Sequence, residues 1–324
     1  MRIYDPLRRS SLRPLVIVWG LVACTSGVLP QPIPTEIVDE FTGPDAQKLD
    51  LLFVVDNSVT MWEEQELLIA SIPQMYDALY DHNVDLHIGA VSTDMVDPDQ
   101  SGRLWAVGDK RYIDESTENP VEQLTQLLKM GIDGDGNERG RRAAYTALET
   151  LVDTDNQGFY RPDATLAIIT ISDEEDGSGV PQSGIEGLSV DTFIDWLTQL
   201  KTEAHAVSYS VIVTPEFGCI SGASPGLEYW YISEAVGGVA WSICEPEYAT
   251  PLLRVADLMR INSVPFPLSQ HPREETLEVR LNDEALDNDS YEYFPDERVV
   301  RIYTDQQMIR DTDDVRITYD PLQY

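Results

Sequence analysis

The chain has 324 residues, of which 42% are hydrophobic, enough to bury one large core and a smaller one. Its 22 basic and 57 acidic side chains give a formal net charge of -35 at pH 7. Such a field repels phosphate backbones and anionic lipid surfaces, which excludes nucleic acid as a partner and favours cations such as calcium. Solvation of the surface in a salty or extracellular setting is the simpler explanation of most of this charge.

Residues 1–23 are predicted to be a signal peptide. Three arginines, Arg8, Arg9 and Arg13, precede the apolar stretch 15–22, the order of a positive region and a hydrophobic region in an export signal. Eight apolar residues are too few to span a bilayer as a helix. The sequence therefore predicts an exported protein.

The sequence Leu21-Val22-Ala23-Cys24 resembles the bacterial lipobox, which implies that Cys24 becomes the lipidated first residue of the mature protein. Thr25 stands where Asp would indicate retention in the inner membrane of many Gram-negative bacteria. We therefore expect a lipid-anchored protein of the cell envelope, in the outer membrane, on its periplasmic or surface side. Ordinary cleavage after Ala23 and a cytosolic protein with an apolar leader are the alternatives.

Residues 24–47 are rich in Pro, Gly, Ser and Thr and show no period. This composition predicts a tether between the membrane and a folded domain.

From residue 48 to residue 262, apolar runs typical of strands buried on both faces alternate with segments of helical spacing. The predicted strands are 51–55, 86–91, 103–107, 165–171 and 206–213. The predicted helices are 61–80, 121–130, 138–152, 190–203, 228–236 and 247–261. This alternation predicts an α/β domain with a Rossmann-like, mostly parallel sheet flanked by helices on both faces.

Residues 263–324 change to a period of two, as in the alternating segments 277–281 and 315–319. Asn/Asp-rich turns separate these segments. The pattern predicts a small C-terminal antiparallel β domain of about four strands.

If Cys24 carries lipid, two cysteines remain, Cys219 and Cys244. In an oxidising compartment an isolated pair is expected to form a disulfide, although two buried thiols are the alternative. The four histidines are scattered without zinc spacing.

A group of oxygen donors follows the first predicted strand of the α/β domain. Asp56, Ser58 and Thr60 lie at a spacing of two between that strand and a helix. Oxygen ligands at such a turn suit the hard cations Mg²⁺, Mn²⁺ or Ca²⁺. Alone the motif is weak, because Asp or hydroxyl side chains also cap helices.

A second acid strengthens the case, because Asp173 follows the strand 165–171. Parallel neighbouring strands would bring both carboxylates to one edge of the sheet, where ligands collect in such folds. This order resembles the von Willebrand factor type A (vWA) domain over about residues 48–262. The resemblance implies a metal-ion-dependent adhesion site (MIDAS) with Asp56, Ser58, Thr60 and Asp173 as ligands. With the lipobox, the chain resembles predicted type A lipoproteins of some Gram-negative bacteria.

The second loop departs from the family pattern. The resemblance leads us to expect a Thr before the helix 138–152, but residues 133–138 read Asp-Gly-Asp-Gly-Asn-Glu. We expect Asp135 and Asn137 to substitute as oxygen ligands, which would shift the preference toward calcium. An EF-hand is rejected because its closing twelfth position falls on Ala144. A glycine-rich turn with solvated acids is the alternative.

Some other groups have simpler explanations. The acids 174–176 are expected to form an acidic surface loop, although a second cation site is possible chemically. Thr93 and Asp94 end the second strand and are expected to serve a turn. Trp230, Tyr231 and Trp241 are expected to pack in the core.

The resemblance implies a binding protein, not an enzyme. The cation would leave one position open, and an acidic group of a protein partner would complete its coordination. One alternative is a structural envelope protein whose metal only stabilises the fold. The other is a phosphatase-like hydrolase, which is disfavoured because Ser58 stands where the general acid of a D-x-D-x-T motif is needed.

Overall fold

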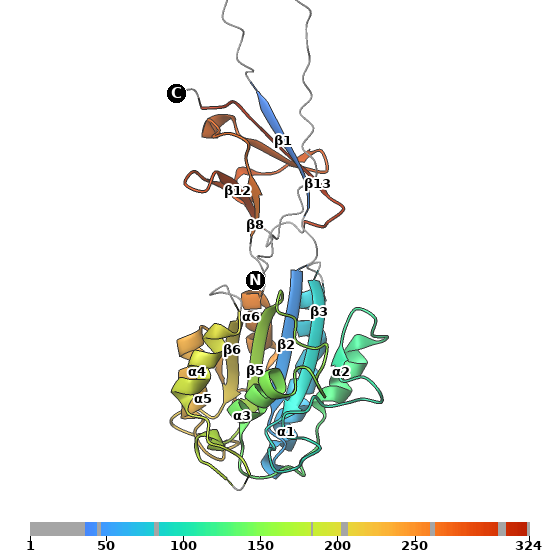
Figure 1. The fold of residues 1–324 in the computed structure, drawn as a ribbon, viewed down its shortest axis with the longest axis vertical. Helices are drawn as coiled ribbons and strands as arrows, with labels where there is room; N and C mark the ends of the chain where they lie inside the picture. The colour runs from blue at the N-terminus through green and yellow to red at the C-terminus, as the bar shows by residue number, and fades with distance from the viewer. Residues whose placement is uncertain are drawn as a thin grey trace, which may run out of the picture.

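The computed structural model describes residues 36–43, 47–80, 84–182, 184–201, 207–259, 263–303 and 309–322. The predicted signal peptide and the lipidation site Cys24 lie outside these residues. The described residues form a large α/β unit and a smaller all-β unit (Figure 1). In the described part of the chain, no helix is both long enough and apolar enough to cross a membrane.

The α/β unit is built on one six-stranded sheet with the strand order β4-β3-β2-β5-β6-β7. All neighbouring pairs are parallel except β3 with the short edge strand β4. The expected mostly parallel sheet is therefore confirmed. Its strands are β2 (Gln47–Val55), β3 (Val84–Ser92), β4 (Tyr112–Ile113), β5 (Thr165–Ser172), β6 (Val207–Val213) and β7 (Ala240–Ser242).

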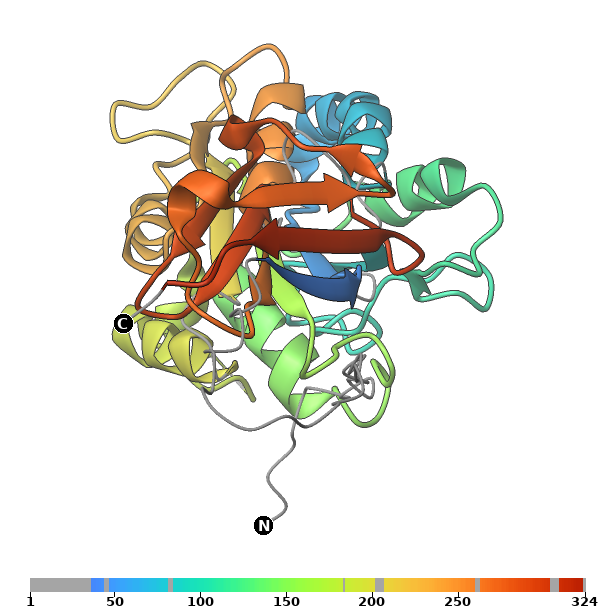
Figure 2. The same cartoon turned by 90° about the horizontal axis from the view of Figure 1, so that it is seen from above.

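Helices cover both faces of this sheet. Figure 2, which looks along the strands, shows α1 and α6 on one side and α3 and α4 on the other. The α-helices are α1 (Trp62–Tyr80), α2 (Pro120–Leu128), α3 (Gly140–Tyr145), α4 (Val190–Gln199), α5 (Leu227–Val236) and α6 (Ala249–Met259). A π-helical turn, Thr146–Thr150, continues α3, so the helix expected over 138–152 is split into two parts.

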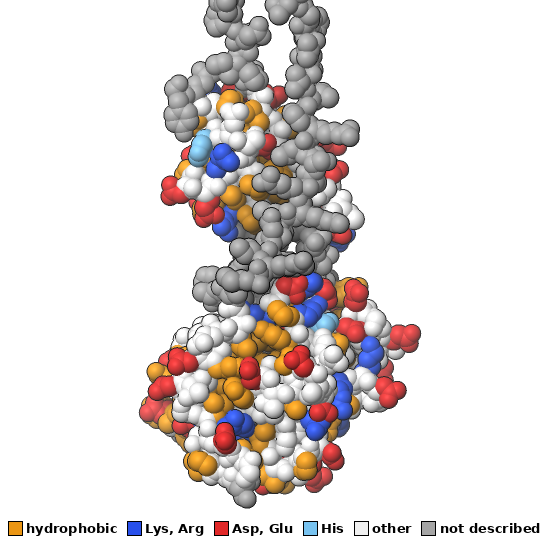
Figure 3. Space-filling model, in the orientation of Figure 1, with side chains coloured by type: hydrophobic (Ala, Val, Ile, Leu, Met, Phe, Trp, Pro, Cys, Tyr) orange, Lys and Arg blue, Asp and Glu red, His pale blue; other side chains and the backbone are white. Residues whose placement is uncertain are grey.

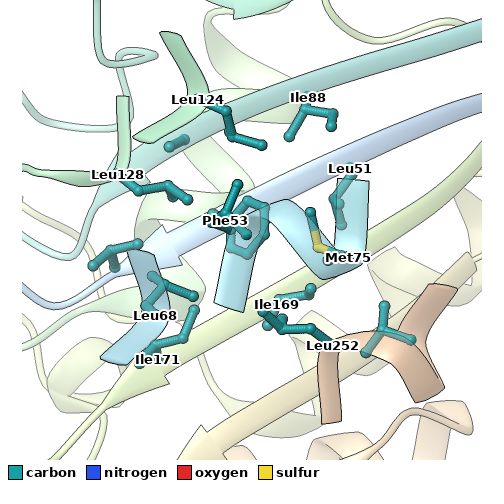
Figure 4. Packing of buried hydrophobic residues seen from close by; sticks show 14 of the residues in the cluster. Leu51, Phe53, Leu68, Met75, Ile88, Leu124, Leu128, Ile169, Ile171 and Leu252 are labelled. Carbon is teal, nitrogen blue, oxygen red and sulfur yellow. The ribbon is translucent and has the colours of Figure 1, made fainter. Parts of the chain in front are cut away.

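The central strand β2 separates two hydrophobic clusters, which is why its sequence is a continuous apolar run. Leu51 and Phe53 point to the α1 side, and Leu52 and Val54 point to the α3 side, all fully buried. Figure 4 shows the α1 side, where Phe53 lies among leucines and isoleucines of several elements. Each fully buried side chain of this size contributes about 2 kcal/mol.

The predicted strand 103–107 is wrong. These residues form a loop, in which Trp105 N donates to Ala90 O and Val107 makes an isolated bridge with Lys110. The antiparallel edge strand is β4, further along the chain. Leu104 is 1% exposed. Leu104 is apolar because the loop packs its side chain into the core. From the sequence pattern alone, a buried loop residue cannot be distinguished from a buried strand residue.

The smaller unit holds two antiparallel sheets. In the described residues one has the order β1-β13-β9-β10 and the other β11-β12-β8, so about four strands was an underestimate. The strands are β1 (Ile37–Thr42), β8 (Ser263–Pro267), β9 (Glu278–Leu281), β10 (Glu284–Ala285), β11 (Tyr291–Phe294), β12 (Val299–Tyr303) and β13 (Asp314–Tyr319).

The predicted tether, residues 24–47, is wrong for residues 37–42, which form strand β1. Residues 37–42 were assigned to an unstructured segment, but they pair along their whole length with β13. Ile37 and Phe41 pack against the hydrophobic cluster of this unit, and the residues between them alternate toward solvent. The period of two was present, but it is short and the surrounding prolines obscured it.

The smaller unit lies beyond the ends of the sheet where the strands begin (Figure 1). Strand β2 starts shortly after β1, and β8 follows α6. The carboxyl ends of the parallel strands lie at the opposite end of the α/β unit and are left uncovered by the β unit. On the visible face in Figure 3, acidic side chains are spread over the surface with Lys and Arg interspersed, which agrees with a solvating role for much of the charge.

Candidate functional site

Asp56 lies at the carboxyl end of β2, where it continues the ladder by donating its backbone N–H to Ile171 O at 2.9 Å. Its side chain is fully buried. Ser58 N donates to Oδ1 at 2.8 Å, and the Ser172 hydroxyl donates to Oδ2 at 2.6 Å. These bonds stabilise the charged form, but burial is the larger effect and raises the pKa of the carboxyl.

The hydroxyls of Ser58 and Thr60 lie beside each other. Their oxygens are 3.1 Å apart, and Thr60 Oγ1 also donates to Asp173 Oδ1 at 3.3 Å. Ser58 occupies the cap position of the short helical turn Val59–Met61, yet its side chain makes no capping hydrogen bond. The helix-cap explanation therefore does not account for the Ser58 hydroxyl.

Asp173 follows β5, the strand next to β2, and it reaches the Asp56 loop as the parallel register requires. It is 1% exposed, and its Oδ2 has no hydrogen-bond partner among the described residues. Burial, and then the charge of Asp56, raise the pKa of this carboxyl to about 6. The structure thus brings together four of the predicted ligands, Asp56, Ser58, Thr60 and Asp173.

The second loop approaches the first through its backbone. Gly134 N donates to Asn57 O at 2.9 Å. A Cβ atom added to Gly134 would lie 2.3 Å from Asn57 Oδ1, so a larger residue would require the buried Asn57 side chain to move. Gly134 therefore suits the close packing of this loop against the Asp56 turn, whereas a Cβ atom at Gly136 would meet nothing within 4 Å.

The other two predicted ligands make their contacts elsewhere. Asp135 N donates to Asp94 Oδ2 at 3.1 Å, and Asp135 Oδ1 accepts from Asn137 N at 3.1 Å. The Asn137 amide lies 3.1 Å from Gln182 Oε1 and is exposed. We find no contact that joins Asp135 or Asn137 to Asp56 among the interactions of the described residues.

Glu138 is the residue of this loop that the sequence reasoning missed. It is 1% exposed, and Oε2 accepts a hydrogen bond from the Thr93 hydroxyl. Burial, and then the charge of Asp56, raise the pKa of Glu138 to about 10. Its Oε1 has no partner among the described residues. The available signal was its position, because Glu138 is the last acid of the loop and lies two residues before α3 begins at Gly140.

Two further carboxyl groups face the same region. Glu64, in the first turn of α1, is 3% exposed and its Oε2 lacks a partner within the described residues. Burial, and then the charges of Asp173 and other acids, raise its pKa. Burial and the charges of Asp56 and Asp173 also raise the pKa of Glu174. After burial, the charges that raise these pKa values are those of other carboxylates.

The donor set fits a hard divalent cation, provided that hydroxyls are included. In the described part of the chain, no three or more His, Cys, Asp or Glu side chains are grouped as a metal site. A site here therefore depends on the hydroxyls of Ser58 and Thr60 beside the carboxylates of Asp56 and Asp173. The unpartnered oxygen of the buried Asp173 is what a cation would satisfy.

The acids after Asp173 have structural roles. Glu175 accepts from Leu227 N and Glu228 N at the start of α5. Asp176 forms an ion pair of 2.9 Å with Arg141, and both side chains are fully buried. These contacts tie the loop after β5 to the rim of the site, so a second cation is not needed to explain these two acids.

The predicted disulfide is present between Cys219 and Cys244, whose Cα atoms are 6.2 Å apart. It joins the loop after β6 to the segment after β7. Of the aromatic residues between these cysteines, Tyr231 is not in the core as predicted, whereas Trp230 packs against the core. Tyr231 is 57% exposed, and Trp230 is only partly buried.

No protein-family model and no curated protein matches the chain. Solved structures do match, at low similarity. A von Willebrand factor type A structure from Catenulispora acidiphila is 13% identical, with a TM-score of 0.41 over 90% of this chain and 62% of that one. Proximal thread matrix protein 1 from the mussel byssus is 12% identical, with a TM-score of 0.41 over 70% of this chain and 51% of that one.

The pilus adhesin SpaC from Lactobacillus rhamnosus GG is 8% identical, with a TM-score of 0.44 over 88% of this chain and 40% of that one. The chain thus spans less than two thirds of the length of each of these structures. Its own strand order, antiparallel edge strand and helices on both faces agree with the von Willebrand factor type A-like fold that the sequence predicts.

Proposed function

We propose that this protein is a cell-envelope lipoprotein that binds protein partners through a divalent cation held at the carboxyl ends of β2 and β5. The observation that carries the proposal is the cluster of buried carboxyl groups around Asp56, with unpartnered oxygens on Asp173 and Glu138. Burying carboxylates side by side is costly, so these groups either take up protons or are balanced by a bound cation.

The residues that would hold the cation are Asp56, Ser58, Thr60 and Asp173. Glu138 adds a carboxyl group beside Asp56, where the resemblance leads us to expect a Thr. Hard oxygen donors that include the Asp56 and Asp173 carboxylates suit Ca²⁺, Mg²⁺ or Mn²⁺, and the added carboxyl group of Glu138 would favour Ca²⁺. When bound, the cation would offer a coordination position to an acidic group of a partner.

Thr60 and Val59 lie on the exposed side of the site, and Val59 is 69% exposed. A partner would therefore approach over the Ser58–Thr60 turn, at the end of the α/β unit away from the smaller unit. Lipidation at Cys24 and an outer-membrane location belong to the same proposal.

Terbium luminescence tests the cation directly. Trp62 is close in sequence to Thr60 and is 58% exposed, so it can sensitise Tb³⁺ bound at the site. We expect emission that Ca²⁺ competes away and that Asp56→Asn abolishes. Asp195→Asn, on the exposed surface of α4, is the matched control. Equal emission from Asp56→Asn and the unmodified protein would rule out this site.

A purely fold-stabilising metal is the second candidate function, favoured by the depth of the carboxylates. Asp56 is fully buried and Asp173 is 1% exposed. Immobilised peptides with and without a central Asp separate the two functions, measured in Ca²⁺ and in EDTA. Binding that needs both the Asp and Ca²⁺ supports adhesion. Calcium that raises the melting temperature without any such binding supports the structural function.

A further inference from the structure

A pocket of about 350 Å³ opens beside the loop that follows β6. One wall is this loop, from Thr214 to Phe217, and the other is formed by α5 from Leu227 to Glu234. The pocket is on the same edge of the sheet as Asp173, whose backbone O accepts from the Thr214 hydroxyl at 2.9 Å. The lining residues are Thr214, Pro215, Glu216, Phe217, Gly226, Leu227, Trp230, Tyr231 and Glu234.

Three aromatic side chains line this pocket, and two of them are exposed. Phe217 is 95% exposed and Tyr231 is 57% exposed. Trp230 packs one part against the core and lines the pocket with another. Exposed large apolar side chains that surround a pocket are more frequent at binding sites than elsewhere on a protein surface.

The loop that forms this wall is held in place before any ligand arrives. The disulfide between Cys219 and Cys244 fixes its middle. Ala223 N and Ser224 N both donate to Asp173 O, at 2.9 and 3.0 Å, and fix its end. A wall that is already ordered loses little conformational entropy on binding, so a small side chain can bind measurably.

The charged side chains that line the pocket favour a positively charged ligand. Its charged side chains are Glu216 and Glu234, both exposed carboxylates. The indole N–H of Trp230 donates to Glu234 Oε1 at 3.3 Å and so places this carboxylate beside the ring. Carboxylates next to aromatic faces attract a cation through both charge and ring quadrupole, whereas an acidic ligand is repelled.

We propose that this pocket binds a lysine or arginine side chain of a partner protein. The long alkyl part of such a side chain would pack on Phe217 and Tyr231, and its charged end would lie between Glu216 and Glu234. The inference does not depend on the proposed cation, because no lining residue is one of its ligands.

Short peptides provide the test. The probes are acetylated, amidated pentapeptides Gly-Ser-Xaa-Ser-Gly with arginine, lysine, norleucine or glutamate at the centre. Binding to the full chain is followed by NMR from the indole N–H signal of Trp230, assigned with a Trp230→Phe variant. We expect the arginine and lysine peptides to bind about five- to tenfold more tightly than norleucine, and glutamate not to bind.

Two variants locate the charge effect. The double substitution Glu216→Gln with Glu234→Gln should reduce arginine binding to the level of norleucine. The control is Glu115→Gln. Glu115 is an exposed acid next to β4, the outermost strand on the side of the sheet away from β6 and β7, and its substitution should leave arginine binding unchanged. All affinities should be the same in EDTA and in Ca²⁺, which separates this result from the outcome of the metal experiment.

Three results would overturn the inference. Equal binding of norleucine and arginine would make the pocket an apolar docking surface without charge selection. Unchanged arginine binding in the double variant would place the cation elsewhere. No binding of any peptide at the highest soluble concentration would show that the pocket does not take a basic side chain.

Discussion

Replacing Asp173 by Asn should change the stability of the metal-free and metal-loaded protein in opposite directions. Asp173 is 1% exposed, and burial together with the charge of Asp56 raises its pKa. The neighbouring carboxylate therefore opposes its ionisation. Asparagine keeps the shape and removes the charge, so the metal-free variant should be more stable than the unmodified protein at neutral pH.

The metal-loaded protein should show the reverse order. A ligand at 100 times its dissociation constant stabilises the native state by about 2.7 kcal/mol. For a domain of this size, each kcal/mol raises Tm by about 2–4 °C, so calcium should raise Tm by roughly 5–10 °C. Asp173→Asn removes one of two carboxylates beside Ser58 and Thr60. Most of this shift should then be lost.

Differential scanning calorimetry in EDTA and in saturating Ca²⁺ measures both effects, with Asp195→Asn as the control. The two Tm values should cross, with the variant higher in EDTA and lower in Ca²⁺. A variant that melts below the unmodified protein in EDTA would refute the repulsion between Asp173 and Asp56. A variant that keeps the full calcium shift would refute Asp173 as a ligand.

Glu138→Thr should lower the affinity for Ca²⁺ relative to Mg²⁺, measured by isothermal titration calorimetry, because it removes a carboxyl beside the site; an unchanged ratio would place Glu138 outside the metal's influence. Arg141→Met should cost about 3–5 kcal/mol in urea unfolding, because it leaves the buried Asp176 carboxylate without its 2.9 Å partner, and a smaller cost would show that water reaches the pair. Cys219→Ser should lower the free energy of unfolding by about 3 kcal/mol, because the disulfide links two cysteines 25 residues apart. Adding a reductant to the unmodified protein should reproduce this loss. Phe41→Ala should cost about 1–2 kcal/mol in the smaller unit alone, followed there by hydrogen exchange, because Phe41 packs on the ring of Phe266 5.3 Å away; equal loss in the α/β unit would contradict the separation of the two cores.

Local patterns were enough to predict most elements of the α/β unit. The apolar run before Asp56 predicts a strand buried on both faces, and the helical spacing of residues 61–80 predicts the helix observed as α1. The prediction failed for 103–107 and for 37–42. In the first, an apolar residue served loop packing, and in the second, a strand found its partner almost 280 residues away.

The candidate site divides in the same way. Asp56, Ser58, Thr60 and Asp173 could be named from sequence because each follows a strand, and parallel pairing brings strand ends to one edge. The second loop does not directly follow a strand of the sheet, so strand register does not predict which of its residues faces the site. Several oxygen donors within six residues were equivalent in the sequence, and the sequence reasoning chose Asp135 and Asn137.

The sequence by itself determined most strands and helices of the α/β unit, the donors at the strand ends and the expected cysteine pair. Only the tertiary structure decided which acid of the second loop is buried beside Asp56, and that Trp230 and Tyr231 line a pocket. The physical reason is the distance along the chain between the residues that interact. Periodicity and strand ends follow from neighbouring residues, whereas the burial of Glu138 depends on Thr93 and Asp56, which approach it from other strands.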